Sequence, residues 1–242
     1  MTALMLTRPL LRSRLSGEIE NILLKGIIKG QLAVGEKLPT ERELARDLVV
    51  NRSTVREALG RLESLDLVEI RHGDGVYVKN YLESGNLELI RAMIRLDDRQ
   101  RDDIIAALLE FRTIIGPEMA FRAAENRTEE HLVSLEEVIW KNEDLSILEK
   151  DIRVHHIIAL AGANVLYLTL LNFFNKFVVE YGYLYFNDQE NVKRSQRFHE
   201  EIYHAIRDRN AGLARKIMKD VLLYAQNVVV DTLQIGKKSN RR

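Results

Sequence analysis

The sequence predicts a mainly α-helical protein of two domains, the first carrying a small β-hairpin and the second being an all-α helical bundle. Apolar residues recur at three- and four-residue intervals over most of the 242 residues, which is the spacing of amphipathic helices. The stretch 68–78 instead alternates apolar and polar residues around a glycine-containing turn. Between residues 87 and 233 every segment fits a helix and none fits a strand.

The domain boundary is predicted near residues 79–85, because Tyr-Leu-Glu-Ser-Gly-Asn at 81–86 has the composition of a linker. The expected segments are an N-terminal domain at 1–79, a linker and first connecting helix at 80–100, a helical domain at 101–235 and a basic tail at 236–242.

The first two helices are predicted from periodicity and from a capping signal. Residues 12–28 carry apolar side chains at helical spacing and form one amphipathic helix. Thr40 is followed three residues later by Glu43, a capping-box pattern in which each side chain accepts a hydrogen bond from the other residue's backbone. A second helix therefore begins at this threonine and runs through Leu44 and Leu48.

A third helix is expected after a short break at residues 49–51, with Asn51 or Ser53 as its N-cap, and it should end near Asp66. Its apolar residues fall on one face and its arginines on the other. The inward set is Val55, Leu59, Leu62 and Leu65, and the outward set is Arg52, Arg56 and Arg61.

Two short strands follow, with Val68 and Ile70 on the first and Val76 and Val78 on the second. The turn between them reads His-Gly-Asp-Gly, which favours a hairpin. Helix, capped helix, tight turn, helix and hairpin together make the order of a winged helix-turn-helix, in which the third helix enters the major groove of DNA.

The chemistry of this segment agrees with DNA binding. Arg52 and Arg56 lie near the start of the third helix, where arginine can pair bidentately with guanine. Phosphate contacts are expected from Arg42, Asn51, Ser53 and Thr54, and close approach of the wing tip to DNA from His72 and Gly73. The alternative is that the arginines only solvate a helix face, and the formal net charge of +0 does not by itself indicate a nucleic-acid partner.

Extended motifs strengthen the DNA-binding interpretation. Gly-Glu-Lys-Leu-Pro-Thr-Glu-Arg-Glu-Leu-Ala, Asn-Arg-Ser-Thr-Val-Arg-Glu-Ala-Leu and His-Gly-Asp-Gly-Val-Tyr-Val resemble the signature of the GntR superfamily of transcriptional regulators. The remainder resembles the FadR subfamily through Phe-Arg-Thr-Ile-Ile, Ala-Gly-Ala-Asn and Tyr-Leu-Tyr-Phe-Asn. The resemblance implies a homodimer on a palindromic double-stranded operator, and DNA contacts from Arg42, Asn51, Arg52, Ser53, Arg56, His72 and Gly73.

Several other classes of protein are excluded or disfavoured. With no cysteine, the chain has no disulfides, thiolate metal sites or cysteine nucleophiles. Residues 157–171 form the longest apolar stretch, which is interrupted by Asn164 and is too short to span a bilayer, so it is interpreted as a buried helix. The N-terminus carries its arginines after its apolar residues, unlike a secretory signal. We therefore expect a cytoplasmic protein with no membrane partner.

Arg112 is the first candidate sensing residue in the helical domain. It shares a helix face with Leu108, Ile115 and Met119, so its guanidinium should point into the bundle. A buried charge needs a partner, and that partner is either an internal carboxylate or a ligand. The resemblance favours the ligand, since domains of the FadR type use an arginine at this place in their effector cavity.

Asp151 and His155 are four residues apart on one helix, and His199 falls on the apolar face of another, which is a spacing suited to metal ligands. The resemblance implies a divalent metal of the zinc or nickel type, bound by one aspartate and three histidines. The fourth expected histidine falls at Val221, so the set is incomplete. An internal Asp–His pair without metal is the alternative, while His156 and His204 point elsewhere on their helices.

The expected function is an effector-responsive DNA-binding regulator whose operator affinity is controlled by a small-molecule carboxylate. Similarity to acyl-coenzyme A regulators along Tyr-Gly-Tyr-Leu-Tyr-Phe suggests a fatty acid or acyl-coenzyme A, although Lys219, Val221 and Val229 on the last helix depart from those regulators and leave a smaller organic acid open. One alternative is a metal-dependent hydrolase using Asp151, His155 and His199, but no nucleophile elbow or phosphate loop accompanies them. Another is a helical interaction module with a vestigial DNA-binding segment.

Overall fold

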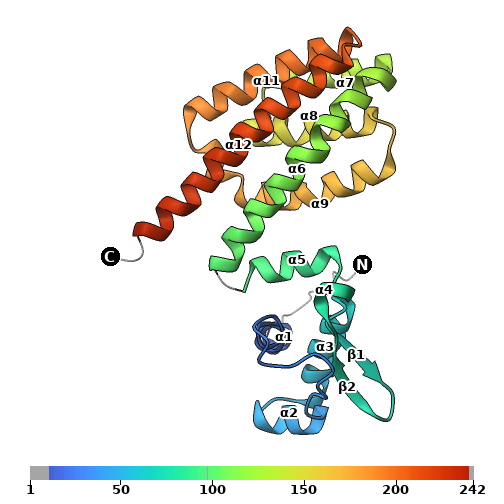
Figure 1. Ribbon diagram of the computed structural model, residues 1–242, viewed down its shortest axis with the longest axis vertical. Helices are drawn as coiled ribbons and strands as arrows, with labels where there is room; N and C mark the ends of the chain where they lie inside the picture. Colours follow the sequence, from blue (N-terminus) through green and yellow to red (C-terminus); the bar gives the residue numbers. More distant parts are fainter. Residues whose placement is uncertain (1–10, 97, 240–242) are drawn as a thin grey trace, which may run out of the picture. The chain divides into compact units, whose positions relative to one another are not determined.

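The computed structural model describes residues 11–96 and 98–239 and is mainly helical, as the sequence predicts (Figure 1). Its contacts divide the chain into two compact units, one ending at Arg101 and the other beginning at Asp102. Each unit has its own buried apolar core. None of the described helices is both long enough and apolar enough to cross a bilayer.

The first unit contains the winged helix-turn-helix. Its elements are α1 (Leu11–Ile28), α2 (Glu41–Asp47), α3 (Arg52–Ser64), β1 (Val68–Arg71) and β2 (Gly75–Val78). The two strands are antiparallel, with Val68 opposite Val78 and Ile70 opposite Val76. Helix α3 contacts α1, α2 and β1, which makes it the centre of the unit.

The predicted helix starts are explained by local hydrogen bonds. Thr40 and Glu43 form the capping box at the start of α2, with the Thr40 backbone N–H donating to Glu43 Oε2 at 2.8 Å. Asn51 occupies the N-cap position of α3, although its side chain makes no capping hydrogen bond. Beneath them, Leu24, Leu59 and Leu62 are completely or almost completely buried.

The segment predicted as a linker is ordered in two short helices, α4 (Tyr81–Ser84) and α5 (Leu87–Ile94). The side chains of Asn80 and Asn86 cap them. Asn86 Nδ2 also donates to the carbonyl oxygen of Ser64 at 2.9 Å, and Leu89 is buried in the first unit's core. Residues 80–96 therefore belong to the first unit. The composition of a linker does not reveal this, because it does not show that the two asparagines start helices.

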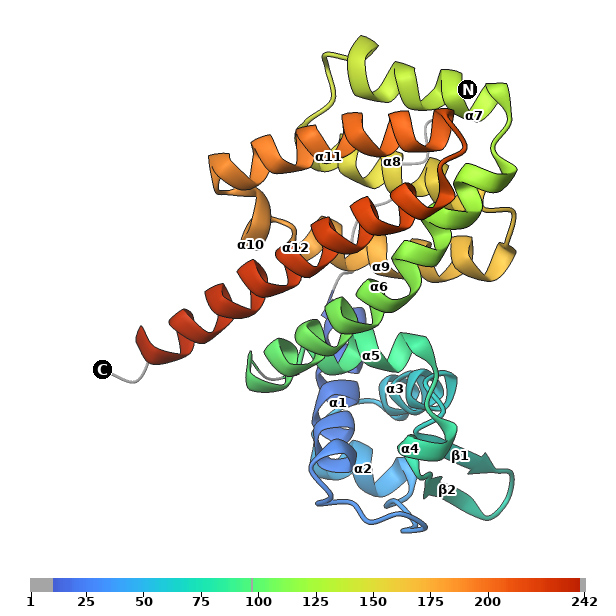
Figure 2. The ribbon, with the colours of Figure 1, turned by 45° about the horizontal axis from the view of Figure 1, so that its top comes forward.

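The described residues of the second unit form helices joined by short turns and contain no strand. Its elements are α6 (Asp98–Asn126), α7 (Glu129–Glu136), the π-helical turn η1 (Glu137–Lys141), α8 (Ile147–Ala161), α9 (Val165–Tyr181), α10 (Tyr183–Phe186), α11 (Gln189–Arg207) and α12 (Ala211–Ser239). Helix α8 lies between α9 and α11, and α12 runs beside α11 (Figure 2). Residues 236–239 of the predicted basic tail are part of α12, and residues 240–242 lie outside the described residues.

The prediction of one buried helix over residues 157–171 is wrong. Helix α8 ends at Ala161 and α9 begins at Val165, and both Val165 and Leu166 are exposed. Between them Ala163 has a left-handed φ of 51°, and the Asn164 side chain accepts a hydrogen bond from the Leu166 backbone N–H. The asparagine was identified in the sequence as a break in hydrophobicity, but it also starts a new helix.

Candidate DNA-binding surface and helical-domain cavity

The start of α3 presents a polar surface. Asn51, Arg52 and Ser53 are exposed, and Arg42 is exposed on the neighbouring helix α2. Arg52 makes no hydrogen bond or ion pair with another described residue, so its guanidinium is available to a ligand. Bidentate donation to guanine requires an arginine of this kind at the N-terminal end of a recognition helix.

Arg56 is also exposed, but it already has a partner. Its Nη2 lies 2.6 Å from Glu41 Oε2, and its Nε lies 2.8 Å from Glu41 Oε1. These hydrogen bonds lower the pKa of the Glu41 carboxyl, with the nearby charge of Arg52 adding to the effect. The pair joins α2 to α3 and holds a carboxylate at the surface where phosphates would approach.

Two other residues of α3 are less exposed than the sequence predicts. Thr54 is only 2% exposed, so it is not part of the exposed surface that carries Arg52. Arg61, expected on the outer face, is half-buried and donates to Glu57 at 2.8 Å and to Glu20 at 3.4 Å. It therefore ties α3 to α1.

The wing tip is formed by His72 and Gly73, both exposed. Gly73 has a φ of +81°, a conformation that residues with a side chain rarely adopt, although a Cβ there would meet no other atom. The glycine is thus needed for the turn itself. Asp74 stiffens the tip, since it accepts hydrogen bonds from Lys37 Nζ at 2.9 Å and from the Tyr77 hydroxyl at 2.8 Å.

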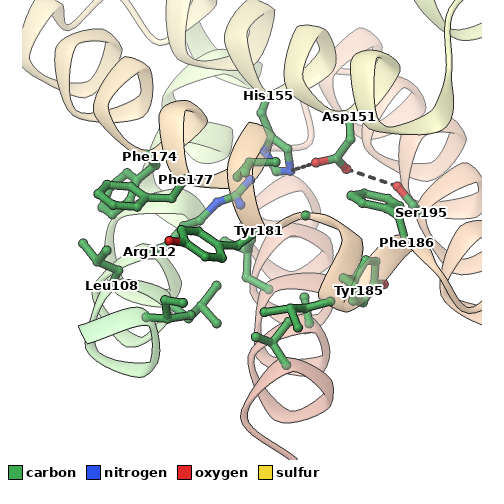
Figure 3. A pocket seen from close by; sticks show the side chains of 18 of the residues that line it. Leu108, Arg112, Asp151, His155, Phe174, Phe177, Tyr181, Tyr185, Phe186 and Ser195 are labelled. Atoms are coloured by element: carbon green, nitrogen blue, oxygen red, sulfur yellow. Dashed lines mark hydrogen bonds and ion pairs between the residues drawn. The ribbon is translucent and has the colours of Figure 1, made fainter. Parts of the chain in front are cut away.

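The second unit contains a cavity of about 110 Å³ between α6, α8, α9 and α12 (Figure 3). Most of its wall is apolar. Aromatic side chains come from Phe174, Phe177, Tyr181, Tyr185 and Phe186, and aliphatic ones from Leu108, Leu109, Val178, Val221, Leu222 and Val229. The polar residues of the wall are grouped together and include Arg112, Asp151, His155 and Ser195.

Arg112 extends from α6 into this cavity toward His155 (Figure 3). Leu108, one turn earlier on α6, lines the same cavity. The guanidinium makes no hydrogen bond or ion pair with any residue in the described part of the chain. Burial lowers the pKa of Arg112, and the negative charge of Asp151 partly offsets this. A buried guanidinium without acceptors is costly, and an anion would supply the acceptors that it lacks.

Asp151, His155 and His199 come together, and Asp151 and His155 line the same cavity as Arg112. Asp151 Oδ1 lies 3.3 Å from His199 Nε2, and Asp151 Oδ2 lies 3.7 Å from His155 Nε2. The Ser195 hydroxyl donates to Asp151 Oδ1 at 3.1 Å. Burial alone would raise the pKa of Asp151, but the two imidazoles and Arg112 hold it below its ordinary value. Burial and Arg112 lower the pKa of His155 to about 3.

These residues do not by themselves make a metal centre. Among residues 11–96 and 98–239, no group of three or more histidine, aspartate or glutamate side chains is arranged to hold a metal ion. Asp151 is hydrogen-bonded to His199 and lies within ion-pair distance of His155, and the position of the fourth expected ligand, Val221, contributes an aliphatic side chain to the cavity wall. The divalent metal stays a prediction.

The sequence interpretation missed Ser195 and, in the aromatic wall, Phe174 and Phe177. Ser195 precedes His199 by four residues, so helical spacing places both on one face of α11, and this signal was present in the sequence. Tyr185 belongs to the Tyr-Gly-Tyr-Leu-Tyr-Phe stretch that suggested an acyl effector, and it lines the cavity. Its hydroxyl is buried with no hydrogen-bonding partner among the described residues, and burial raises the pKa of Tyr185 to about 12.

Comparison with known proteins also divides the chain into two parts, but at residues 78 and 79 and not at residues 101 and 102. Residues 15–78 match the family model of bacterial regulatory proteins of the gntR family, and residues 79–231 match that of the FadR C-terminal domain. A fatty acid metabolism regulator protein of Shewanella frigidimarina is 28% identical over 202 residues, which are 83% of this chain and 84% of that protein.

Another similar protein is not named as a fatty acid metabolism regulator. The HTH-type transcriptional regulator LutR of Bacillus subtilis is 30% identical over 214 residues, which are 84% of this chain and 95% of that protein. Among solved structures, the Listeria monocytogenes protein Lar has a TM-score of 0.52 at 18% identity, covering 92% of this chain and 97% of that one, which supports the fold alone.

The hydrolase alternative does not agree with these matches, which are to transcription regulators and not to enzymes. The chain belongs to the GntR family of bacterial DNA-binding transcription regulators and carries a FadR C-terminal domain.

Proposed function

We propose that the chain binds a palindromic operator as a homodimer and that a carboxylate-bearing effector, bound in the cavity of the second unit, controls its affinity for DNA. The observation that carries the effector part is Arg112, a cation without a hydrogen-bonding partner among the described residues that extends into an otherwise mainly apolar cavity. DNA binding itself follows from the family.

The energetic reason for a negatively charged effector is the cost of burying an unpaired charge, which is on the order of several kcal/mol. Asp151 offsets part of this cost, but it is also hydrogen-bonded to Ser195 and His199. A carboxylate can accept two parallel hydrogen bonds from the planar guanidinium, which is the strongest arrangement available to arginine. The ligand would therefore neutralise Arg112 without disturbing the Asp151 group.

The apolar walls indicate the rest of the effector. A cavity of 110 Å³ is somewhat smaller than the roughly 150 Å³ cavities that hold benzene, so it accommodates only a few carbon atoms beyond a carboxylate. A longer acyl chain would have to extend past the present walls. We therefore propose a free monocarboxylic acid, of the short organic or fatty-acid type, in preference to an acyl-coenzyme A, whose thioester offers no charge to Arg112. The relatives named for fatty acid metabolism support an aliphatic acid.

The test begins with an operator selected from random duplex DNA by the wild-type protein. Fluorescence anisotropy at one fixed salt concentration then measures operator affinity during titration with lactate, octanoate or octanoyl-coenzyme A. At least one free acid should change the affinity of the wild type by about five- to 150-fold, the usual range of allosteric coupling. Arg112→Ala should bind the operator but lose this response.

The matched control is Arg215→Ala, which removes an arginine that pairs with Glu118 at 2.6 Å and does not line the cavity. This variant should respond to the acid as the wild type does. If Arg112→Ala responds at the wild-type acid concentration, the effector site lies elsewhere. Sedimentation of the free protein and of its operator complex tests whether the chain forms a homodimer. A protein that remains monomeric on DNA would contradict the proposal.

A further inference from the structure

Val49, in the turn between α2 and α3, has an unusual backbone conformation. Its φ is 53°, in the left-handed region. Its backbone N–H donates to the Arg46 carbonyl at 3.3 Å, and the Val50 N–H donates to the Ala45 carbonyl at 2.9 Å. This pair of hydrogen bonds is the Schellman motif that ends a helix, and Val49 occupies the position where glycine is usual.

A valine is poorly suited to this position. The branched Cβ clashes with the backbone when φ is positive, so β-branched residues adopt the left-handed region far less readily than asparagine, aspartate or glycine. The other non-glycine residues with positive φ in the described part of the chain are Asp66, Ala163 and Arg209, which carry no branch at Cβ. The turn therefore holds Val49 under strain that a glycine would relieve.

Packing inside the protein does not compensate for this strain. Val49 is 88% exposed, whereas Val50, the next residue, is partly buried and packs on the core of the first unit. The isopropyl group of Val49 lies beside an open hollow that is also lined by Leu15 and Asn51. Strained residues that the fold does not require are concentrated at functional sites.

Val49 lies close in the sequence to the residues of α3 from which base contacts are expected. It lies two residues before Asn51 and three before Arg52, at the end of α3 that a helix-turn-helix presents to base edges in the major groove. An aliphatic group there cannot bind phosphate. The apolar group that the major groove offers is the C5-methyl of thymine. We propose that Val49 packs against a thymine methyl of the operator and contributes to sequence specificity at that base pair.

This proposal rests on the DNA-binding activity of the family and not on the effector. Its test uses the operator selected by the wild-type protein, in which each thymine is replaced in turn by deoxyuridine to remove only the methyl group. Affinity is measured for the wild type and for Val49→Gly. Burial of one methyl group corresponds to an affinity change of about threefold to tenfold.

At one position, deoxyuridine should weaken wild-type binding by that factor and leave Val49→Gly unaffected, because the variant has no side chain to lose the contact. Val49→Gly should also bind the unmodified operator about threefold to tenfold more weakly, while its melting temperature rises by about 2–4 °C because the strain is gone. The control Val34→Gly removes another exposed valine of the same unit and should bind like the wild type at every position.

Two results would overturn the proposal. One is equal operator affinity of Val49→Gly and the wild type. The other is a deoxyuridine effect of the same size in both proteins at every thymine, which would assign the methyl contacts to other residues. Loss of folding does not confound the test, since glycine is the residue that this backbone position favours.

Discussion

The guanidinium of Arg56 donates hydrogen bonds to both carboxylate oxygens of Glu41, at 2.6 and 2.8 Å, and so connects the two helices of the helix-turn-helix. The arginine side chain is 70% exposed and the glutamate side chain 31%, so solvent screens much of their attraction. The pair therefore matters more for the charge presented to DNA than for the stability of the fold. Arg52 differs from Arg56 because it has no such hydrogen-bonded carboxylate among the described residues.

Replacing Arg52 by alanine should weaken specific operator binding by about 1–3 kcal/mol, because one bidentate contact to a base is lost. The measurement is a binding isotherm at fixed salt, with Arg91→Ala on α5 as the control that removes an arginine outside α3. The fold should be unchanged, since Arg52 is exposed. An unchanged affinity would mean that Arg52 only solvates the helix.

Replacing Arg56 by alanine should weaken operator binding more in the wild-type background than in a Glu41→Gln background. In the single variant the Glu41 carboxylate loses its partner and repels the phosphates, whereas the double variant carries no such charge. A double-mutant cycle measures this difference. Equal losses in both backgrounds would show that the Glu41–Arg56 pair has no influence on DNA binding.

Stability should fall as the pH decreases from about 6.5 toward 3, in part because of His155. Its pKa is about 3 in the folded protein against an ordinary 6.5, so the unfolded chain takes up a proton across this window and the folded one does not. Between pH 7 and pH 5 this group should remove about 2 kcal/mol of unfolding free energy.

The pH effect is measured by denaturant unfolding of the wild type, His155→Gln and His204→Gln at pH 7 and pH 5. His155→Gln should lose this part of the pH dependence, whatever its overall stability. His204 is exposed, so His204→Gln is the control and should retain the wild-type dependence. A wild-type dependence in His155→Gln would mean that this imidazole is not held neutral by its surroundings.

Val221→His should raise the affinity for zinc or nickel by at least about tenfold, because it supplies the imidazole missing beside Asp151, His155 and His199. The measurement is a metal titration followed by calorimetry at pH 7.5. Val229→His, on the same helix and also in the cavity wall, is the matched control and should change the affinity little. Equal gains in the two variants would show that α12 does not place residue 221 beside the other ligands.

The sequence by itself determined the features that depend on neighbours along the chain. The capping box of Thr40 and Glu43, the hairpin from Val68 to Val78 and the helical faces of Arg112 and His155 all follow from spacings of a few residues, which backbone geometry fixes. The family motifs, which are runs of adjacent residues, likewise identify a GntR regulator. Local spacing shows which way a side chain faces.

Only the tertiary structure decided which groups these side chains meet. It paired Arg56 with Glu41, 15 residues away, and Ser195 with Asp151, 44 residues away, while leaving Arg112 without a hydrogen-bonding partner among the described residues. It also buried Thr54 and exposed Val49, although both belong to the same short turn and helix start. The physical reason is that partners distant in the sequence are chosen by how whole helices pack, and periodicity within one helix carries no information about its neighbours.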